Sequence, residues 1–249
     1  MTELSARIAE DARKLGINNG DTLLVHSSLR SLGGATAEEV IKGLMNAVGE
    51  EGTLVFPALS YMHCNPNQRK FDYYNTPSNV GALPEYFRTS VSGVVRSINP
   101  THSCCAWGKN AEYVTSGHIL DNTPCGKYSP FRRVMELGGK ILFLGCGMTP
   151  NTSMHAVEEL SDPDYLFGDE YEYDITDSKG EKCKIMCRAH NFKGVYQRYE
   201  RLAELLKDDE LIMGNILSSQ CHLVEASAMW KKADEKYREC PHYFIDKDE

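Results

Sequence analysis

The sequence lacks three features that would each have fixed a class of protein: a long apolar run, an export signal and internal repetition. No stretch of eighteen apolar residues occurs among its 249 residues, so no membrane-spanning helix and no membrane partner are expected. Residues 1–7 lack the apolar core of a secretory signal, which predicts a cytoplasmic location. Because repeats, low-complexity tracts and linkers are also missing, we expect a single domain over residues 1–249.

The chain also has fewer positively than negatively charged residues. The formal net charge is −8, and no basic stripe is present, which disfavours nucleic acid as a partner. An acidic protein attracts a polyamine, but acidity also serves solubility alone. Charge therefore permits a polycationic small-molecule substrate without predicting one.

Cysteine is present, but not in a pattern that makes a disulfide framework or a metal centre. The count is nine, which is odd, and a chain of this length without an export signal does not need disulfides. No Cys-x-x-Cys with a second half at zinc spacing occurs; the nearest groupings are Cys104-Cys105, Cys183 with Cys187, and Cys221-His222. We expect no metal, and we expect Cys183 and Cys187 to carry free, partly buried thiols on one face of a strand.

The N-terminal part of the sequence contains alternating helix and strand patterns. Apolar residues at helical spacing predict a helix over residues 2–15, and an apolar run predicts a strand over residues 22–25. Thr36 followed by Glu39 is a capping box that starts a second helix, and residues 53–56 form the next strand. Strand, helix and strand in this order predict a right-handed βαβ unit.

Later elements are expected at wider intervals. They are a short helix through Arg88 with Pro84 at its first position, a strand over residues 94–97, a β-hairpin over residues 169–187 and a last helix over residues 223–233.

The stretch over residues 139–159 carries the first candidate site. Residues 141–144 form a short apolar run bounded by glycines, typical of a buried strand, and a helix follows from about Thr152. His155 falls in the first turn of that helix, and Glu158 lies three residues later on the same face. An imidazole at the carboxyl end of a strand, with a carboxylate for its far nitrogen, is a general-base arrangement. The alternative is a polar histidine that only satisfies the start of a helix.

A second candidate site is the loop over residues 27–34. It combines three hydroxyls, the guanidinium of Arg30 and flexible glycines beyond the carboxyl end of a strand, where ligands of open α/β sheets bind. Backbone amides and a cation can hold a pyrophosphate. The spacing matches neither a Walker A nor a G-x-G-x-x-G motif, so a solvated loop remains the alternative on the residues alone.

Six pieces of the chain occur together in an order that resembles the aminoglycoside 3-N-acetyltransferase family. They are LLVHSSLRSLG (residues 23–33), GTLVFP (52–57), PSNVGALPE (77–85), RSINPTHS (96–103), GKYSPF (126–131) and the stretch 139–159. The resemblance runs from about residue 20 to residue 159 and weakens after that. It implies a single α/β domain with an extended mixed β-sheet flanked by helices, unlike the Gcn5-related acetyltransferases, with a hairpin-and-helix portion from about residue 165.

The resemblance also implies an activity and roles for residues. Members move the acetyl group of acetyl-CoA to the 3-amino group of the 2-deoxystreptamine ring of an aminoglycoside, directly and without an acyl-enzyme, and so confer antibiotic resistance. His155 would be the general base and Glu158 would orient it, and no metal would take part. The residues implied for coenzyme A are Ser27, Ser28, Leu29, Arg30, Ser31 and Ser103.

Departures from the family keep alternatives open. Asn99 stands where members usually carry histidine, and the acceptor-binding carboxylates of the resistance enzymes lie partly in the weakly matching C-terminal third. The same chemistry on a non-antibiotic amine, such as an amino sugar or a nucleotide-linked amine, is therefore a second hypothesis.

Two hypotheses come from other functional classes. One is a zinc-dependent hydrolase or zinc-binding module that uses cysteines with His26, His63, His102 or His155. The other is a protein that binds coenzyme A without catalysis. A covalent route through Cys104 or Cys105 is a further alternative mechanism. The chain is expected to act as a monomer or a homodimer.

Overall fold

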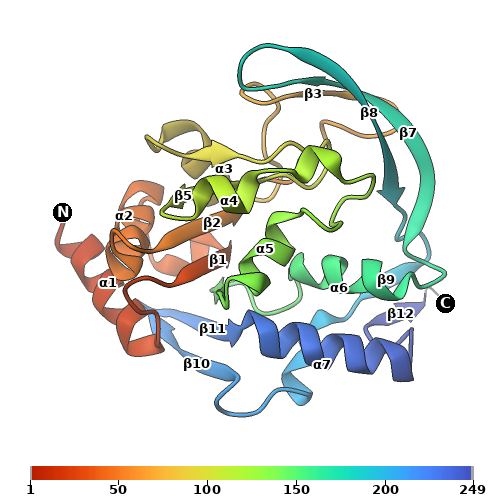
Figure 1. Cartoon of the computed structure of the whole chain (residues 1–249). Helices are drawn as coiled ribbons and strands as arrows, with labels where there is room; N and C mark the ends of the chain where they lie inside the picture. Colours follow the sequence, from red (N-terminus) through yellow and green to blue (C-terminus); the bar gives the residue numbers. More distant parts are fainter. Residues whose placement is uncertain (1, 248–249) are drawn as a thin grey trace.

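A mixed β-sheet runs through the centre of the computed structural model, which describes residues 2–247 (Figure 1). Within these residues the sheet has seven strands, and the middle three are parallel to one another while the outer ones are antiparallel. In spatial order they are β10 (Leu211–Ile216), β11 (Ser219–Glu225), β6 (Lys140–Leu144), β1 (Thr22–Ser27), β2 (Thr53–Pro57), β5 (Cys104–Gly108) and β4 (Val95–Arg96).

Helices cover both faces of this sheet because its strands are apolar on both sides. Leu23 and Val25 of β1 face one core and Leu24 faces the other, as the alternation along a strand requires. The first core lies under α1 (Glu3–Leu15), α2 (Ala37–Val48) and α3 (Ala82–Ser90). The second lies under α4 (Ala111–Thr115), α5 (Pro130–Glu136), α6 (Ser153–Ser161) and α7 (Ala226–Glu239). The predicted α/β fold with a mixed sheet flanked by helices is confirmed.

The βαβ unit expected near the N-terminus is β1, α2 and β2. Thr36 caps α2: its hydroxyl accepts the Glu39 amide at 3.2 Å, and the Glu39 carboxylate accepts the Thr36 amide at 3.0 Å. β1 and β2 then pair in parallel from Thr22 opposite Thr53. The capping box and the unit are both confirmed.

A second, smaller sheet stands apart from the central one. The predicted hairpin is β7 (Phe167–Thr176) with β8 (Lys182–His190), and β3 (Lys70–Asp72) adds to β7 in parallel. These strands arch over the edge of the molecule in Figure 1 and pack on a core of their own, built of Cys64, Phe71, Tyr173, Ile175 and Cys187. β9 (Val195–Gln197) pairs with β12 (Ile245–Lys247), and single 3₁₀ turns are η1 (Leu29–Leu32), η2 (His118–Leu120) and η3 (Tyr199–Glu204).

Two expectations about helices need correction. The last helix was expected over residues 223–233, but Leu223 and Val224 belong to β11, and α7 begins only at Ala226. A short apolar run buried on both faces does not distinguish strand from helix, which explains the error. Pro84 is the third residue of α3, not the first, a position still within the first turn where no intrahelical donor is needed.

Among residues 2–247 all nine cysteines are free, but Cys183 is exposed while Cys187 is buried, so only one of that pair is covered. Within the same residues, no helix combines the length and the apolarity that a membrane crossing requires.

Candidate active site

A cavity of about 690 Å³ opens at the carboxyl ends of the parallel strands. One wall is formed by residues 25–27 of β1, by Pro57 of β2 and by residues 149–152 after β6. The opposite wall comes from the end of β8 and from Tyr199 of η3. Ligands of α/β sheets bind at this edge, so the central sheet supplies the floor and the second sheet closes the site.

The turn after β6 brings α6 to this cavity. Gly145 and Gly147 have φ of 67° and 65°, in the left-handed region that favours glycine. A Cβ on Gly145 would lie 1.9 Å from the Ser31 hydroxyl, so the close approach of two loops also requires glycine there. α6 begins at Ser153 with Thr152 before it, as expected, and places His155 in its first turn on the cavity wall.

His155 is held by the carboxylate that the sequence indicated. Its Nδ1 lies 2.9 Å from Glu158 Oε2 and 2.9 Å from the Tyr199 hydroxyl. The Tyr199 hydroxyl donates to Glu158 Oε2 at 2.8 Å, and the Tyr165 hydroxyl donates to Oε1 at 2.9 Å. Because Nδ1 faces a carboxylate, it carries the proton, and Nε2 is left with a lone pair.

The electrostatics of Glu158 favour the ionised form. The side chain is fully buried, and burial alone would raise its pKa. The hydrogen bond and charge of His155, with the hydroxyls of Tyr199 and Tyr165, outweigh burial and leave the pKa of Glu158 below its ordinary value. The carboxylate can therefore stabilise a positive charge on His155.

The neighbouring glutamate serves a different histidine. Glu159 Oε1 lies 2.8 Å from His190 Nε2, and its carboxylate also accepts the Thr123 hydroxyl at 2.5 Å and the Cys125 amide at 2.7 Å. Burial raises the pKa of Glu159 to about 7 against the lowering effect of those two hydrogen bonds. Burial, with the nearby charge of His155, lowers the pKa of His190 well below its ordinary value.

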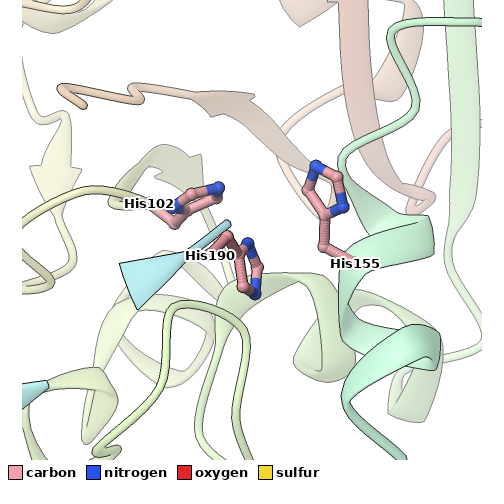
Figure 2. A group of neighbouring side chains, drawn as sticks. All are labelled: His102, His155 and His190. Carbon is pink, nitrogen blue, oxygen red and sulfur yellow. The ribbon is translucent and has the colours of Figure 1, made fainter. Parts of the chain in front are cut away.

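A third imidazole completes the group shown in Figure 2. His102 is buried in the loop between β4 and β5, and its Nδ1 lies 2.8 Å from the Thr101 hydroxyl. Asn99 shapes this loop by accepting the amides of Thr101 and His102 at 3.1 Å and 2.9 Å. The ligand atoms of His102, His155 and His190 all lie within 4.8 Å of one another, so these three residues could hold a metal ion.

The loop expected to bind coenzyme A is only partly in the cavity. Ser27 lines the wall, and its buried hydroxyl has no hydrogen-bond partner among residues 2–247. Ser28, Leu29, Arg30 and Ser31 are not among the wall residues: Arg30 is exposed, and Ser31 bonds to the Ser28 carbonyl and the Ser219 hydroxyl. A role in coenzyme A binding stays a prediction for these residues.

Ser103 and its two cysteine neighbours lie deeper than expected. Ser103 is fully buried: its hydroxyl donates to the Ala58 carbonyl at 2.9 Å and accepts from Arg96 Nε at 3.0 Å, so it holds Arg96 and does not line the cavity. Burial raises the pKa of the Cys104 and Cys105 thiols, in Cys105 to about 12. A thiol in that state is no nucleophile, which disfavours the covalent route.

Sequence reasoning did not assign roles to His190, Tyr165 or Tyr199. Tyr199 is buried, and in the sequence it is one of several apolar residues at helical spacing over residues 199–206. His190 lies at the end of β8, and no local spacing connects it with α6. These residues could be found from the sequence only if it were known that the hairpin folds back over the cavity.

Comparison with known proteins identifies the same family that the sequence motifs resemble. The sequence profile of the family described as aminoglycoside 3-N-acetyltransferase matches residues 24–238. An aminoglycoside N(3)-acetyltransferase III from Salmonella sp is 34% identical over 172 residues, which cover 62% of this chain and 60% of that protein. The match thus spans less than two thirds of the length of this curated relative.

Solved structures match over more of the chain. The structure described as AAC-IIIb binary with CoASH is 25% identical and aligns with a TM-score of 0.81 over 94% of this chain and 96% of that one. A mutant of aminoglycoside acetyltransferase AAC(3)-IVa in complex with a gentamicin is 26% identical, with a TM-score of 0.81 over 96% of this chain and 90% of that one.

Proposed function

The chain belongs to the aminoglycoside 3-N-acetyltransferase family, and on that premise we propose that it moves the acetyl group of acetyl-CoA to an amine, with His155 as general base. One observation carries the proposal: Glu158 and Tyr199 hold Nδ1 of His155, so that Nε2 is the nitrogen left for a substrate in the cavity. An imidazole oriented by a buried carboxylate is the arrangement that general-base catalysis needs.

The reaction follows from what an amine requires. At neutral pH the acceptor is largely an ammonium ion, which has no lone pair, so it must lose a proton to His155 Nε2. The freed nitrogen attacks the thioester carbonyl carbon, the C–S bond breaks, and the coenzyme A thiolate leaves. The attacking nitrogen loses its second proton to the thiolate, and the proton held by His155 passes to solvent. Ionised Glu158 stabilises the imidazolium that forms in between.

Backbone amides at the start of α6 are candidates for stabilising the oxyanion of the tetrahedral intermediate. Residues 149–152 line the cavity, and the Thr152 amide is bonded to the Pro150 carbonyl at 3.1 Å. This leaves the amides of Asn151 and Ser153 for the role.

On the donor side, we propose that the loop of residues 27–31 binds coenzyme A. The exposed guanidinium of Arg30 is available to a phosphate, and a neighbour of the same fold binds CoASH. Arg30→Ala should raise the KM for acetyl-CoA about 10-fold or more and leave kcat nearly unchanged, because it removes a charged contact remote from the reacting atoms. Steady-state kinetics at saturating acceptor test this, with Lys127→Ala as a control away from the loop; an unchanged KM would contradict it.

For the acceptor, an aminoglycoside is the first proposal. Family membership, the net charge of −8 and the neighbour in complex with a gentamicin support it. All catalytic groups named here come from one chain, so a monomer or a homodimer would serve equally.

A second acceptor class is favoured by the cavity itself. None of the wall residues among residues 2–247 is Asp, Glu, Lys or Arg, and tyrosine, phenylalanine, histidine and proline side chains make up much of the lining. A polycation gains affinity from carboxylates in the wall. Their absence from these described residues favours an amine with fewer charges, such as an amino sugar or a nucleotide-linked amine.

The deciding experiment measures release of coenzyme A with a thiol reagent. Aminoglycosides, an analogue without the 3-amino group, and singly charged amino sugars are compared at equal concentration, beside resistance testing in a susceptible host. The first proposal predicts turnover that disappears with the 3-amino-free analogue, and the second predicts turnover with amino sugars instead. No coenzyme A release above the rate of spontaneous hydrolysis with any amine would refute an acetyltransferase function.

A further inference from the structure

The proposed transfer reaction needs one imidazole, yet three meet at the cavity. His102 comes from the loop before β5, His155 from α6 and His190 from the end of β8, and their ligand atoms lie within 4.8 Å of one another. All three line the cavity. Figure 2 shows the three side chains as neighbours.

The other nitrogen of each ring is held from behind. Nδ1 of His155 lies 2.9 Å from Glu158, and Nε2 of His190 lies 2.8 Å from Glu159. Nδ1 of His102 lies 2.8 Å from the Thr101 hydroxyl. Histidines that bind a metal nearly always have such an outer partner, most often a carboxylate, which fixes the ring and its tautomer. The nitrogens left for an ion are Nε2 of His155, Nε2 of His102 and Nδ1 of His190.

The second nitrogen of His190 is an independent sign that the cluster can bind a ligand. The side chain is only 4% exposed, and its Nδ1 is buried without a hydrogen-bond partner among the described residues. A buried polar atom without a partner is rare in folded proteins and unfavourable by about 1–3 kcal/mol. Because Nε2 is used by Glu159, a cation at the centre of the cluster would satisfy the lone pair of Nδ1.

We propose that His102, His155 and His190 bind a divalent transition-metal ion, with Zn²⁺ the best fit. Imidazole nitrogens suit Zn²⁺, Co²⁺, Ni²⁺ and Cu²⁺ and do not suit Mg²⁺ or Ca²⁺. Zn–N bonds of about 2.0–2.1 Å in a tetrahedral site put the nitrogens about 3.3 Å apart, so each ring must close by at most about 0.8 Å. Three protein ligands leave the fourth position open to the cavity.

Metal binding and acetyl transfer exclude one another. The ion takes the lone pair of His155 Nε2, the same lone pair that accepts the proton of the amine. The site is therefore inhibitory and not a cofactor site. This consequence rests on the proposed function, whereas metal binding itself does not.

Binding is measured by titration calorimetry with Zn²⁺ and by the visible absorption of Co²⁺. The exposed thiols of Cys183 and Cys240 would bind zinc on their own, so both are first replaced by serine. We expect one ion per chain and a tetrahedral Co²⁺ spectrum without thiolate charge-transfer bands. Absence of stoichiometric binding, or a spectrum with thiolate bands, would overturn the inference.

Variants locate the ion. His190→Ala should weaken Zn²⁺ binding at least about 100-fold, and Glu159→Gln, which removes only the outer carboxylate, about 10–100-fold. His63→Ala, an exposed histidine outside the cluster, should have no effect. Circular dichroism checks folding, and His102→Asn provides a second ligand variant if His190→Ala does not fold. Equal affinity in the ligand variants and in His63→Ala would refute the site.

An activity measurement separates the two proposals. Zn²⁺ should inhibit coenzyme A release by wild-type protein, EDTA should reverse the inhibition, and His102→Asn should need at least about 10-fold more Zn²⁺ for the same inhibition. If the chain binds zinc at the three histidines but transfers no acetyl group, the proposed function fails and the metal site stands. If transfer is active and insensitive to Zn²⁺ and no ion binds at the three histidines, the metal inference fails. If transfer is insensitive although the ion is bound there, the role of His155 as general base fails.

Discussion

Helix α6 carries two neighbouring glutamates, and each forms a pair with a different histidine. Glu158 holds His155 and Glu159 holds His190, at 2.9 Å and 2.8 Å. Both carboxylates are buried, and both accept further hydrogen bonds. Their acidities nevertheless move in opposite directions: the pKa of Glu158 is lowered, and that of Glu159 is raised to about 7.

The difference lies in the imidazole and not in the carboxylate. The His155 side chain is 13% exposed and opens onto the cavity, and its hydrogen bond and charge are what lower the pKa of Glu158. His190 is 4% exposed, and burial lowers its own pKa, so it offers Glu159 no positive charge. The carboxylate with the lowered pKa is thus the one whose histidine opens onto the cavity, where a general base has to lie.

The largest effect should separate the two histidines. His155→Ala should reduce kcat about 10²–10⁴-fold, because it removes the group that takes the proton. His190→Ala should reduce kcat less than about 10-fold, because its pair does not take up charge. Steady-state release of coenzyme A at saturating substrates measures both, with circular dichroism as the folding control. A larger loss of kcat in His190→Ala than in His155→Ala would indicate that His190 is the general base.

The first pair was open to sequence reasoning and the second was not. His155 and Glu158 lie three residues apart on one helical turn, so helix geometry alone brings them together. His190 lies 31 residues from Glu159 in sequence, and only the way the hairpin folds over the sheet makes them neighbours. Local periodicity carries no information about such a contact.

Contacts between residues far apart in the sequence also determine the conformation of the loop after β1. Its position beyond a strand was evident from the sequence, and β1 and the turn at η1 form there. The direction in which Ser31 points is fixed by Ser219, which is 188 residues away. The buried role of Ser103 likewise depends on Arg96 and on the Ala58 carbonyl across the sheet, contacts that no spacing along the chain indicates.

The next effect concerns stability against pH, where the two glutamates should act in opposite directions. The Glu159 pKa is about 7 in the folded protein against an ordinary value of 4.5, so the folded state keeps a proton that the unfolded state has lost. Its contribution to stability is full below the ordinary value and is lost as pH rises toward the folded value. Relative to wild type, Glu159→Gln should therefore gain roughly 2–3 kcal/mol in free energy of unfolding between about pH 5 and pH 8.

Glu158→Gln is the matched control for that measurement. The pKa of Glu158 is lowered, so its contribution is present above its ordinary value of 4.5 and is lost as pH falls through the folded value. The difference between this variant and wild type should stay flat from about pH 6 to pH 8 and change only in acid. Urea unfolding across this range measures both variants, and parallel curves for the two would contradict the opposite shifts.

A smaller effect on catalysis should distinguish the same two glutamates. Glu158→Gln keeps an acceptor for Nδ1 but removes the negative charge that stabilises imidazolium, which should reduce kcat about 10–100-fold. Glu159→Gln should stay within about threefold of wild type, because the second pair takes up no proton from the substrate. The kcat values of both variants are measured at the same pH and compared with that of wild type. Similar losses of kcat in the two variants would indicate that the two pairs act as one network.

The smallest effect comes from the hydroxyls that support each carboxylate. Tyr199→Phe removes the donor at 2.8 Å from Glu158 Oε2 and the oxygen at 2.9 Å from His155 Nδ1, while the buried ring keeps its packing. Loss of one shared hydrogen bond corresponds to about 0.5–1.5 kcal/mol, so kcat should fall about 2–10-fold. Thr123→Val removes the matching hydroxyl from Glu159 at 2.5 Å and should leave kcat within about twofold. If Thr123→Val reduces kcat as much as Tyr199→Phe does, the charge on His155 depends on both sides of α6, and the separation of the two pairs does not hold.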